Sequence, residues 1–169
     1  MSYTPFEIRD ALESLTVLID TREQDTERAR KRKEDFPRWR REKLDAGDYG
    51  CEIELDGELC RVPVVVERKM SLDELCQCFT RERKRFEREF ERAQQAGTRL
   101  HLLIENASWE KIHAGSYRSQ MKPQALTASI LAWQARYDAR VYFCTPKLAG
   151  KMIAAILRYE TKIYLEGQA

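Results

Sequence analysis

The sequence predicts an α/β fold, in which a mixed central sheet of about five or six strands is flanked by helices on both sides. Two observations carry this prediction. Short apolar runs of strand length alternate along the chain with longer segments of helical periodicity. Asp56-Gly57 stands between two segments of alternating polarity, which is a strong hairpin signal. The 169 residues are enough for one sizeable core, so we expect a single domain over residues 1–169.

The expected elements follow from these patterns in chain order. Ser71 and Glu74 form a capping box, which starts a helix near Leu72. Thr145-Pro146 is typical of the start of the last helix. The first part of the chain is expected to hold a helix at 5–15 within an N-terminal segment 1–15, a strand at 16–20, and a charged, mostly helical segment at 23–44 that is broken at Phe36-Pro37. The hairpin at 48–69 follows, and then helices from 72 and over 81–97. The last part is expected to hold a strand at 100–105, a helical turn at 109–112, a helix from 123, a strand at 141–144 and the last helix.

The hairpin has a definite predicted register. With Asp56-Gly57 as the loop, Leu55 pairs with Glu58, Tyr49 with Val64 and Asp48 with Val65. This register gathers the apolar side chains on one face and the charged ones on the other, which a slip of one residue would scramble. Pro63 lies inside the second strand, where a bulge could shift the pairing by a residue. The apolar face holds Tyr49, Cys51, Ile53, Leu55, Cys60, Val62, Val64 and Val66, and the charged face holds Asp48, Glu52, Glu54, Arg61, Glu67 and Lys69.

The second strand ends on three consecutive charges, Glu67-Arg68-Lys69. Because side chains alternate along a strand, Glu67 and Lys69 share one face and Arg68 points to the other. Asp48 becomes a diagonal neighbour of Glu67 on the same face, within reach of one shared cation. Two carboxylates and an ammonium at the end of a core strand suit metal-assisted hydrolysis of a phosphodiester. The alternative is a plain surface ion pair on a frayed strand end.

Composition limits the remaining possibilities. The net charge is only +2, so binding to nucleic acid has to be argued from local clusters. Five cysteines occur without Cys/His ligand spacing, which argues against a zinc site and against a disulfide framework. There is no signal-peptide pattern and no long apolar run, so we expect no membrane partner and an intracellular location, cytoplasmic or nucleoid-associated in a prokaryote or phage and nuclear in a eukaryote.

Basic side chains cluster at the start of the helix at 81–97. This cluster is either a solvated, ion-paired face or a surface that contacts DNA phosphates, and the sequence leaves both interpretations open. The same holds for the basic segment 28–43, whose Trp39 we expect to pin the segment to the core. The DNA-binding candidates are Arg81, Arg83, Lys84 and Arg85.

Three separated motifs, in this order, resemble the XPF/Hef family of structure-specific nucleases, a branch of the restriction-endonuclease-like (PD-(D/E)XK) superfamily. Gly47-Asp48-Tyr49 is followed by Glu67-Arg68-Lys69 and then by Asp73. Upstream, Val17 to Glu23 resembles the family's first strand, which ends in an Asp-x-Arg-Glu element. The resemblance runs from about residue 17 to about residue 165 and implies a restriction-endonuclease-like fold.

The resemblance implies a metal-dependent endonuclease that cuts branched, flap or fork DNA in repair, recombination or phage and mobile-element DNA processing. Oxygen ligands suit Mg²⁺ or Mn²⁺. We expect Asp48 and Glu67 to bind the metal with the Arg68 backbone carbonyl beside them, and Lys69 to orient or deprotonate the attacking water. The family pattern adds Asp20 and Glu23 as outer carboxylates near the metal, and Arg22 and the Arg68 side chain as site residues. Asp73 either belongs to this motif or only favours the helix start.

Two other functions stay open. One is a non-catalytic DNA-binding or scaffold subunit of a nuclease complex, and the other is a different nuclease of the same superfamily. Retention of all eight charged motif residues, Asp20, Arg22, Glu23, Asp48, Glu67, Arg68, Lys69 and Asp73, favours activity. Relatives commonly carry helix-hairpin-helix modules or a helicase, which we expect to be absent here. The preference for forks or flaps is then left open, and the alternatives are a homodimer formed through the last helices or a separate DNA-binding subunit.

Overall fold

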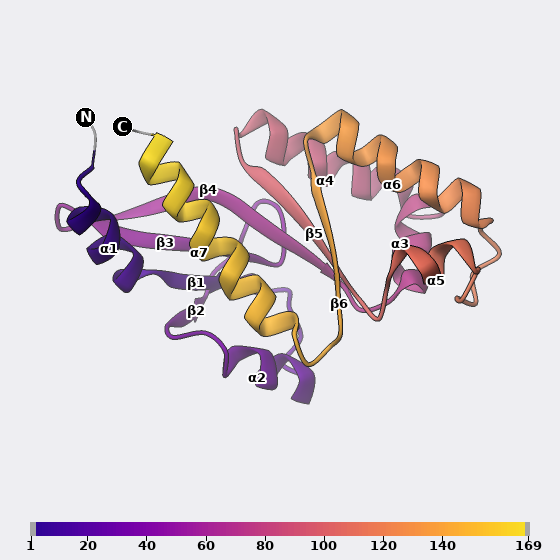
Figure 1. The fold of residues 1–169 in the computed structure, drawn as a ribbon, viewed down its shortest axis with the longest axis horizontal. Helices are drawn as coiled ribbons and strands as arrows, with labels where there is room; N and C mark the ends of the chain where they lie inside the picture. The colour runs from indigo at the N-terminus through magenta and orange to yellow at the C-terminus, as the bar shows by residue number, and fades with distance from the viewer. Residues whose placement is uncertain (1–2, 168–169) are drawn as a thin grey trace.

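A six-stranded mixed sheet forms the centre of the computed structural model, which describes residues 3–167 (Figure 1). The strands, in chain order, are β1 (Thr16–Ile19), β2 (Trp39–Arg41), β3 (Tyr49–Leu55), β4 (Glu58–Lys69), β5 (Arg99–Glu105) and β6 (Arg140–Cys144). Their order across the sheet is β2-β1-β3-β4-β5-β6. β3 is antiparallel to both β1 and β4, and the other neighbouring pairs are parallel. The predicted α/β class and mixed sheet are confirmed.

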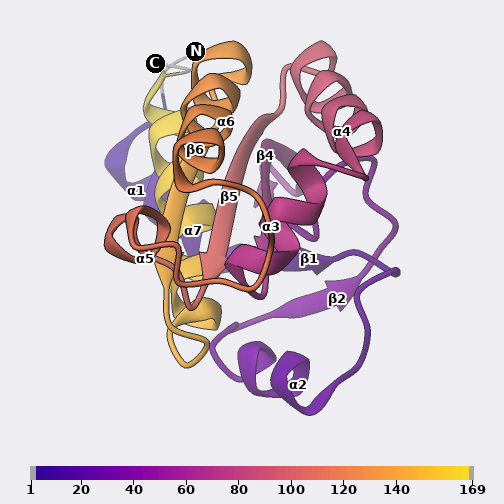
Figure 2. The same ribbon diagram turned by 90° about the vertical axis from the view of Figure 1, so that its right-hand side faces the viewer.

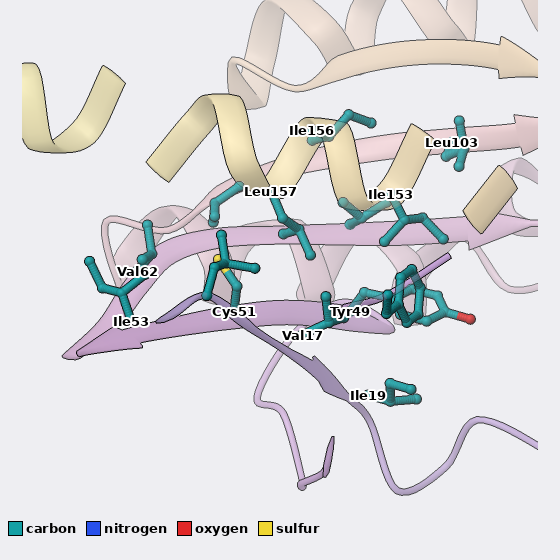
Figure 3. Packing of buried hydrophobic residues seen from close by; sticks show 14 of the residues in the cluster. Val17, Ile19, Tyr49, Cys51, Ile53, Val62, Leu103, Ile153, Ile156 and Leu157 are labelled. Atoms are coloured by element: carbon teal, nitrogen blue, oxygen red, sulfur yellow. The ribbon is translucent and has the colours of Figure 1, made fainter. Parts of the chain in front are cut away.

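Helices cover both faces of the sheet (Figures 1 and 2). Seven are present among residues 3–167: α1 (Pro5–Ser14), α2 (Glu27–Lys33), α3 (Leu72–Phe79), α4 (Arg83–Gln95), α5 (Trp109–His113), α6 (Pro123–Tyr137) and α7 (Ala149–Gly167). α1, α2 and α7 lie on one side, and α3 to α6 on the other. Each side has its own apolar cluster, and Figure 3 shows Ile153 and Leu157 of α7 pointing toward Val17, Cys51 and Tyr49. No helix in this part of the chain is long and apolar enough to cross a membrane.

The hairpin register is correct near the turn and wrong beyond Pro63. Leu55 pairs with Glu58 and Ile53 with Cys60, as predicted, but Tyr49 pairs with Val66 instead of Val64. An irregularity between Gly50 and Glu52 accounts for the shift, which is two residues and not one. Because strand side chains alternate with a period of two, the faces are unchanged. Asp48 consequently moves from the position beside Val65 to the one beside Glu67, and its N–H donates to Val66 O at 2.9 Å.

The structure differs from the prediction at residues 39–41 and at the start of the last helix. Residues 39–41 form an edge strand and not helix, because β2 pairs in parallel with β1. Trp39 is 43% exposed, and its ring lies against the Lys33 ammonium, so the expectation that Trp39 attaches the segment to the core is wrong. Residues 145–148 form a turn, and α7 begins only at Ala149. The segment 23–44, predicted to be mostly helical, is helical only over Glu27–Lys33, so that prediction is largely wrong. The other predicted boundaries agree with the structure within two or three residues.

The strand directions bring three chain segments to one edge of the sheet. β1 ends next to Asp20, β3 starts after Asp48, and β4 ends with Glu67 to Lys69. The N–H of Asp20 donates to Asp48 O at 2.8 Å, which ties the first two segments together. β5 ends beside them at Glu105 because it runs parallel to β4. Residues far apart in sequence therefore meet at this edge.

Candidate active site

Asp48, Glu67 and Lys69 line a single cleft of about 400 Å³ between the sheet edge, α3 and α4. Alternation along β4 places Glu67 and Lys69 on the α3–α4 side, where Val65 also packs. Glu67 is 5% exposed and Lys69 is 9% exposed. The other lining residues are Arg22, Glu23, Gln24, Arg68, Glu74, Cys78, Glu82, Arg85, Phe86, Glu89 and Arg92. The two carboxyl groups predicted to share a cation thus lie in one cleft on one side of the sheet.

Hydrogen bonds hold the side chains of Asp48, Glu67 and Lys69 in place. Lys69 Nζ donates to Glu67 Oε1 at 2.5 Å and lies 5.3 Å from the centre of the Phe86 ring. Asp48 Oδ2 accepts from the backbone N–H of Arg68 at 2.8 Å. One oxygen of each carboxylate is therefore held by the protein, and a short, charge-assisted bond holds the Glu67 side chain.

Electrostatic repulsion and burial act against ionisation of both acids. Burial, with the Glu23 charge adding to it, raises the pKa of Asp48 to about 6. Burial and the Asp48 charge raise the pKa of Glu67 well above its ordinary value. Burial alone would lower the pKa of the Lys69 ammonium, but the charge and hydrogen bond of Glu67, together with the other acidic groups nearby, outweigh it and raise the pKa. The cleft consequently holds two acids that are costly to ionise together and one firmly protonated amine.

Arg68 points to the opposite side of the sheet, as the alternation predicted, and enters a buried ionic network. Its guanidinium contacts Glu105 Oε1 at 3.2 Å and Glu23 Oε1 at 3.3 Å. Arg32 donates to Glu23 at 2.8 Å and to the hydroxyl of Tyr49 at 3.1 Å. That hydroxyl donates to Glu23 Oε1 at 3.1 Å. We call Glu23, Arg32, Tyr49, Arg68 and Glu105 the bracing network. Glu23 belongs to it and also lines the cleft.

Asp20 and Arg22 organise the loops around the cleft. Asp20 Oδ1 accepts from the backbone N–H of Arg22 at 2.8 Å and from its Nε at 2.6 Å. Its Oδ2 accepts from the N–H of Leu44 at 2.7 Å. Burial alone would raise the pKa of Asp20, but these hydrogen bonds outweigh it and lower the pKa. Both oxygens are occupied and the residue does not line the cleft, whereas Arg22 does.

Asp73 is not brought to the cleft. Its Oδ1 accepts from the backbone N–H groups of Arg118 and Ser119, both at 2.8 Å. The carboxylate thus anchors the loop between α5 and α6 to the first turn of α3. Of the eight charged motif residues, the structure gathers Arg22, Glu23, Asp48, Glu67, Arg68 and Lys69 around the cleft and leaves Asp20 and Asp73 outside its lining.

Of the four basic residues predicted to bind DNA, only some lie at the cleft. Arg85 lines the cleft, and Arg83 lies over the Trp133 ring of α6 at 5.1 Å. Arg81 and Lys84 are exposed and do not line the cleft.

Four residues with a part in the site were missed by the sequence analysis. Glu89 and Arg92 of α4 line the cleft, and Arg32 and Glu105 complete the bracing network. Only spacing could have indicated the first two, since Arg85, Glu89 and Arg92 recur at helical intervals. Arg32 stood among seven other basic residues of the 28–41 segment, so no local signal distinguished it.

The donors in the cleft fit one hard cation. Among residues 3–167, no group of three or more His, Cys, Asp or Glu side chains converges as a metal site. Asp48 and Glu67 are the predicted side-chain donors, and the Arg68 backbone carbonyl is the predicted third. Mg²⁺ is commonly held by one or two carboxylates and keeps several waters, so such a sparse set suits it.

Comparisons with known proteins identify the family and the fold. The family model of the ERCC4 domain matches residues 19–156. The structure of XPF from Aeropyrum pernix superposes with a TM-score of 0.62 at 22% identity, covering 86% of this chain and 65% of that one. A second structure, titled as the same protein in complex with DNA, gives 0.62 and 22%, covering 88% and 66%. This chain thus spans just under two thirds of those proteins. No curated protein sequence matches it.

Proposed function

We propose that this chain, which belongs to the ERCC4 domain family, is a divalent-metal-dependent DNA endonuclease. The fold is that of XPF, as the sequence motifs predicted. The observation that carries the proposal is the meeting of Asp48, Glu67 and Lys69 in one cleft. Two acids that repel each other beside one ammonium are poorly satisfied alone and well satisfied by an added cation.

We assign the residues of the cleft separate roles in hydrolysis. Asp48 and Glu67 would hold Mg²⁺ or Mn²⁺, which supplies a Lewis acid and an activated water when bound. Lys69 is firmly protonated beside Glu67, so we assign it to donate a hydrogen bond to the attacking water or to a phosphate oxygen and to balance negative charge in the transition state. This assignment favours orientation over deprotonation of the water. Arg68 and Glu23 hold the ends of β4 and β1 in register from the other face.

DNA is the proposed substrate because basic side chains surround the acids. Arg22, Arg85 and Arg92 line the cleft, and the exposed Arg81 and Lys84 extend the positive surface along the start of α4. The relative whose structure is titled as a complex with DNA supports this choice. Cleavage of forks or flaps, a role in repair or recombination, an intracellular location and action with a second copy or subunit stay predictions.

The test is cleavage of duplex, single-stranded, flap and fork DNA with Mg²⁺, Mn²⁺ or EDTA. We expect metal-dependent cutting, and a loss of at least about 10²-fold for Glu67→Gln and for Lys69→Ala. Circular dichroism and thermal unfolding check that each variant folds. Retention of activity by both variants would overturn the assignment. Metal-independent DNA binding without cutting by the wild type would favour the non-catalytic subunit instead.

A further inference from the structure

Two side chains of helix α4 form hydrogen bonds with the loop that leads into Asp48. Glu89 Oε1 accepts from the backbone N–H of Gly47 at 3.1 Å. One turn later, Arg92 Nε donates to the backbone carbonyl of Asp45 at 3.3 Å. Residues three apart lie on the same face of a helix, so the two side chains hold both sides of the short Asp45–Gly47 segment. Asp48 follows this segment directly.

The loop has little freedom on its other side. Gly47 has a φ of +74°, and a Cβ there would lie 2.8 Å from Val65 Cβ of β4. Glycine alone fits without strain at such a position. Ala46 is buried in the apolar cluster that also includes Ala93 of α4. The backbone before Asp48 is therefore pressed against β4 beneath it and hydrogen-bonded to α4 above it.

These contacts hold the chain just before Asp48. Asp48 itself is held by the sheet, since its N–H donates to Val66 O, its carbonyl accepts from the Asp20 N–H and its Oδ2 accepts from the Arg68 N–H. The Glu89 bond adds a fixed point at the Ala46–Gly47 peptide unit, where the chain enters the strand. A carboxylate makes a stronger bond to an N–H than a neutral acceptor does.

We propose that Glu89 is a positioning residue for Asp48, acting through the Gly47 N–H so that the Asp48 carboxylate stays aimed at the cation site. This inference rests on the proposed function. Groups that orient metal ligands typically contribute about 10- to 100-fold to metal affinity or activity. The structure makes hydrogen-bond acceptance the essential property of Glu89, so an amide should largely replace it.

The experiment compares Glu89→Ala with Glu89→Gln. Glu91→Gln is the matched control, since Glu91 is exposed on the same helix and does not line the cleft. Calorimetric titration of the metal-free protein with Mn²⁺ gives a readout that is independent of cleavage, and Asp48→Asn shows that the titration reports this site. Kinetics on DNA separate kcat from KM, and thermal unfolding checks folding.

We expect Glu89→Ala to weaken Mn²⁺ binding and to lower kcat by about tenfold or more, with little change in the KM for DNA. Glu89→Gln should recover both to within about threefold of wild type. Wild-type behaviour of Glu89→Ala in both measurements would overturn the inference, and so would a Glu89→Gln variant as defective as Glu89→Ala. Failure of the wild type itself to cut DNA would instead refute the proposed function.

Discussion

The two faces of the sheet at the C-terminal end of β4 carry different arrangements of charge. On the cleft face, Asp48 and Glu67 share one ammonium, and burial raises the pKa of both acids. On the other face, Arg68 and Arg32 alternate with Glu23 and Glu105 in the bracing network. The first arrangement places two acids beside one ammonium, whereas the second pairs two acids with two guanidinium groups. A strand of period two thus lets adjacent residues serve binding on one side and rigidity on the other.

This difference separates stability from activity along the same strand. A balanced buried network is costly to break, because removal of one partner leaves the others buried without compensation. An unbalanced cleft should become more stable when one of its acids is neutralised, at the expense of cation binding. The following predictions test this division.

The largest effect on stability is expected from Arg32→Met. The Arg32 side chain is 5% exposed and contacts Glu23 at 2.8 Å and Glu105 at 3.7 Å. Its removal leaves two buried carboxylates and a tyrosine hydroxyl with fewer partners, so we expect a loss of about 3 kcal/mol in the free energy of unfolding. Urea denaturation monitored by circular dichroism measures this value.

Arg30→Met is the control for that experiment. Arg30 lies on the same helix, is mostly exposed and pairs with the exposed Asp25 at 3.2 Å. An exposed pair contributes about 0–1 kcal/mol, so this variant should lie close to wild type. Equal losses for the two variants would mean that the bracing network contributes no special stability.

The second prediction concerns pH in the metal-free protein. Since the pKa of folded Asp48 is raised from 3.8 to about 6, the folded state binds this proton more tightly than the unfolded chain. Its contribution to the free energy of unfolding should therefore fall as the pH rises from about 4 through about 6. Asp48→Asn removes this contribution, so the variant should gain on the order of 2 kcal/mol relative to wild type between pH 4 and pH 7.

Urea denaturation in EDTA at several pH values measures that difference, and Asp25→Asn gives the opposite sign as a control. Hydrogen bonds from Lys33 and Arg30 lower the pKa of Asp25, so its contribution to stability is lost as the pH falls. Asp25→Asn should then lose stability relative to wild type as the pH rises. The same sign for both variants would contradict an electrostatically strained cleft.

Periodicity was sufficient to predict the fold and the central part of the site. The apolar face of the hairpin and the opposed directions of Glu67 and Arg68 follow from the strand period alone, and they survive a two-residue shift of register. The same alternation turns Arg68 toward the carboxylates of Glu23 and Glu105.

Long-range partners could not be predicted in this way. β2 forms because Trp39 to Arg41 meet the free edge of β1, although the segment has no strand pattern of its own. Arg32 is buried because α2 folds back over the end of the sheet, whereas Arg30 and Lys31 of the same helix stay exposed. Glu89 reaches Gly47 across 42 residues of sequence. In each case the tertiary contact, and not local propensity, determines the role.

The smallest effect on activity is expected at Asp73, which the family motif places with the site and the structure places outside the cleft. Asp73→Ala removes the acceptor for two backbone N–H groups, of Arg118 and Ser119, so we expect a loss of about 1 kcal/mol in stability. With no contact to the cleft, kcat should fall by less than about threefold, which is a small change in the activation barrier. Asp48→Ala, measured in parallel on the same DNA, should instead lose at least about 10²-fold. Equal losses of kcat for the two variants, with Asp73→Ala still fully folded, would return Asp73 to the catalytic group and would require α3 to move toward the cleft when DNA binds.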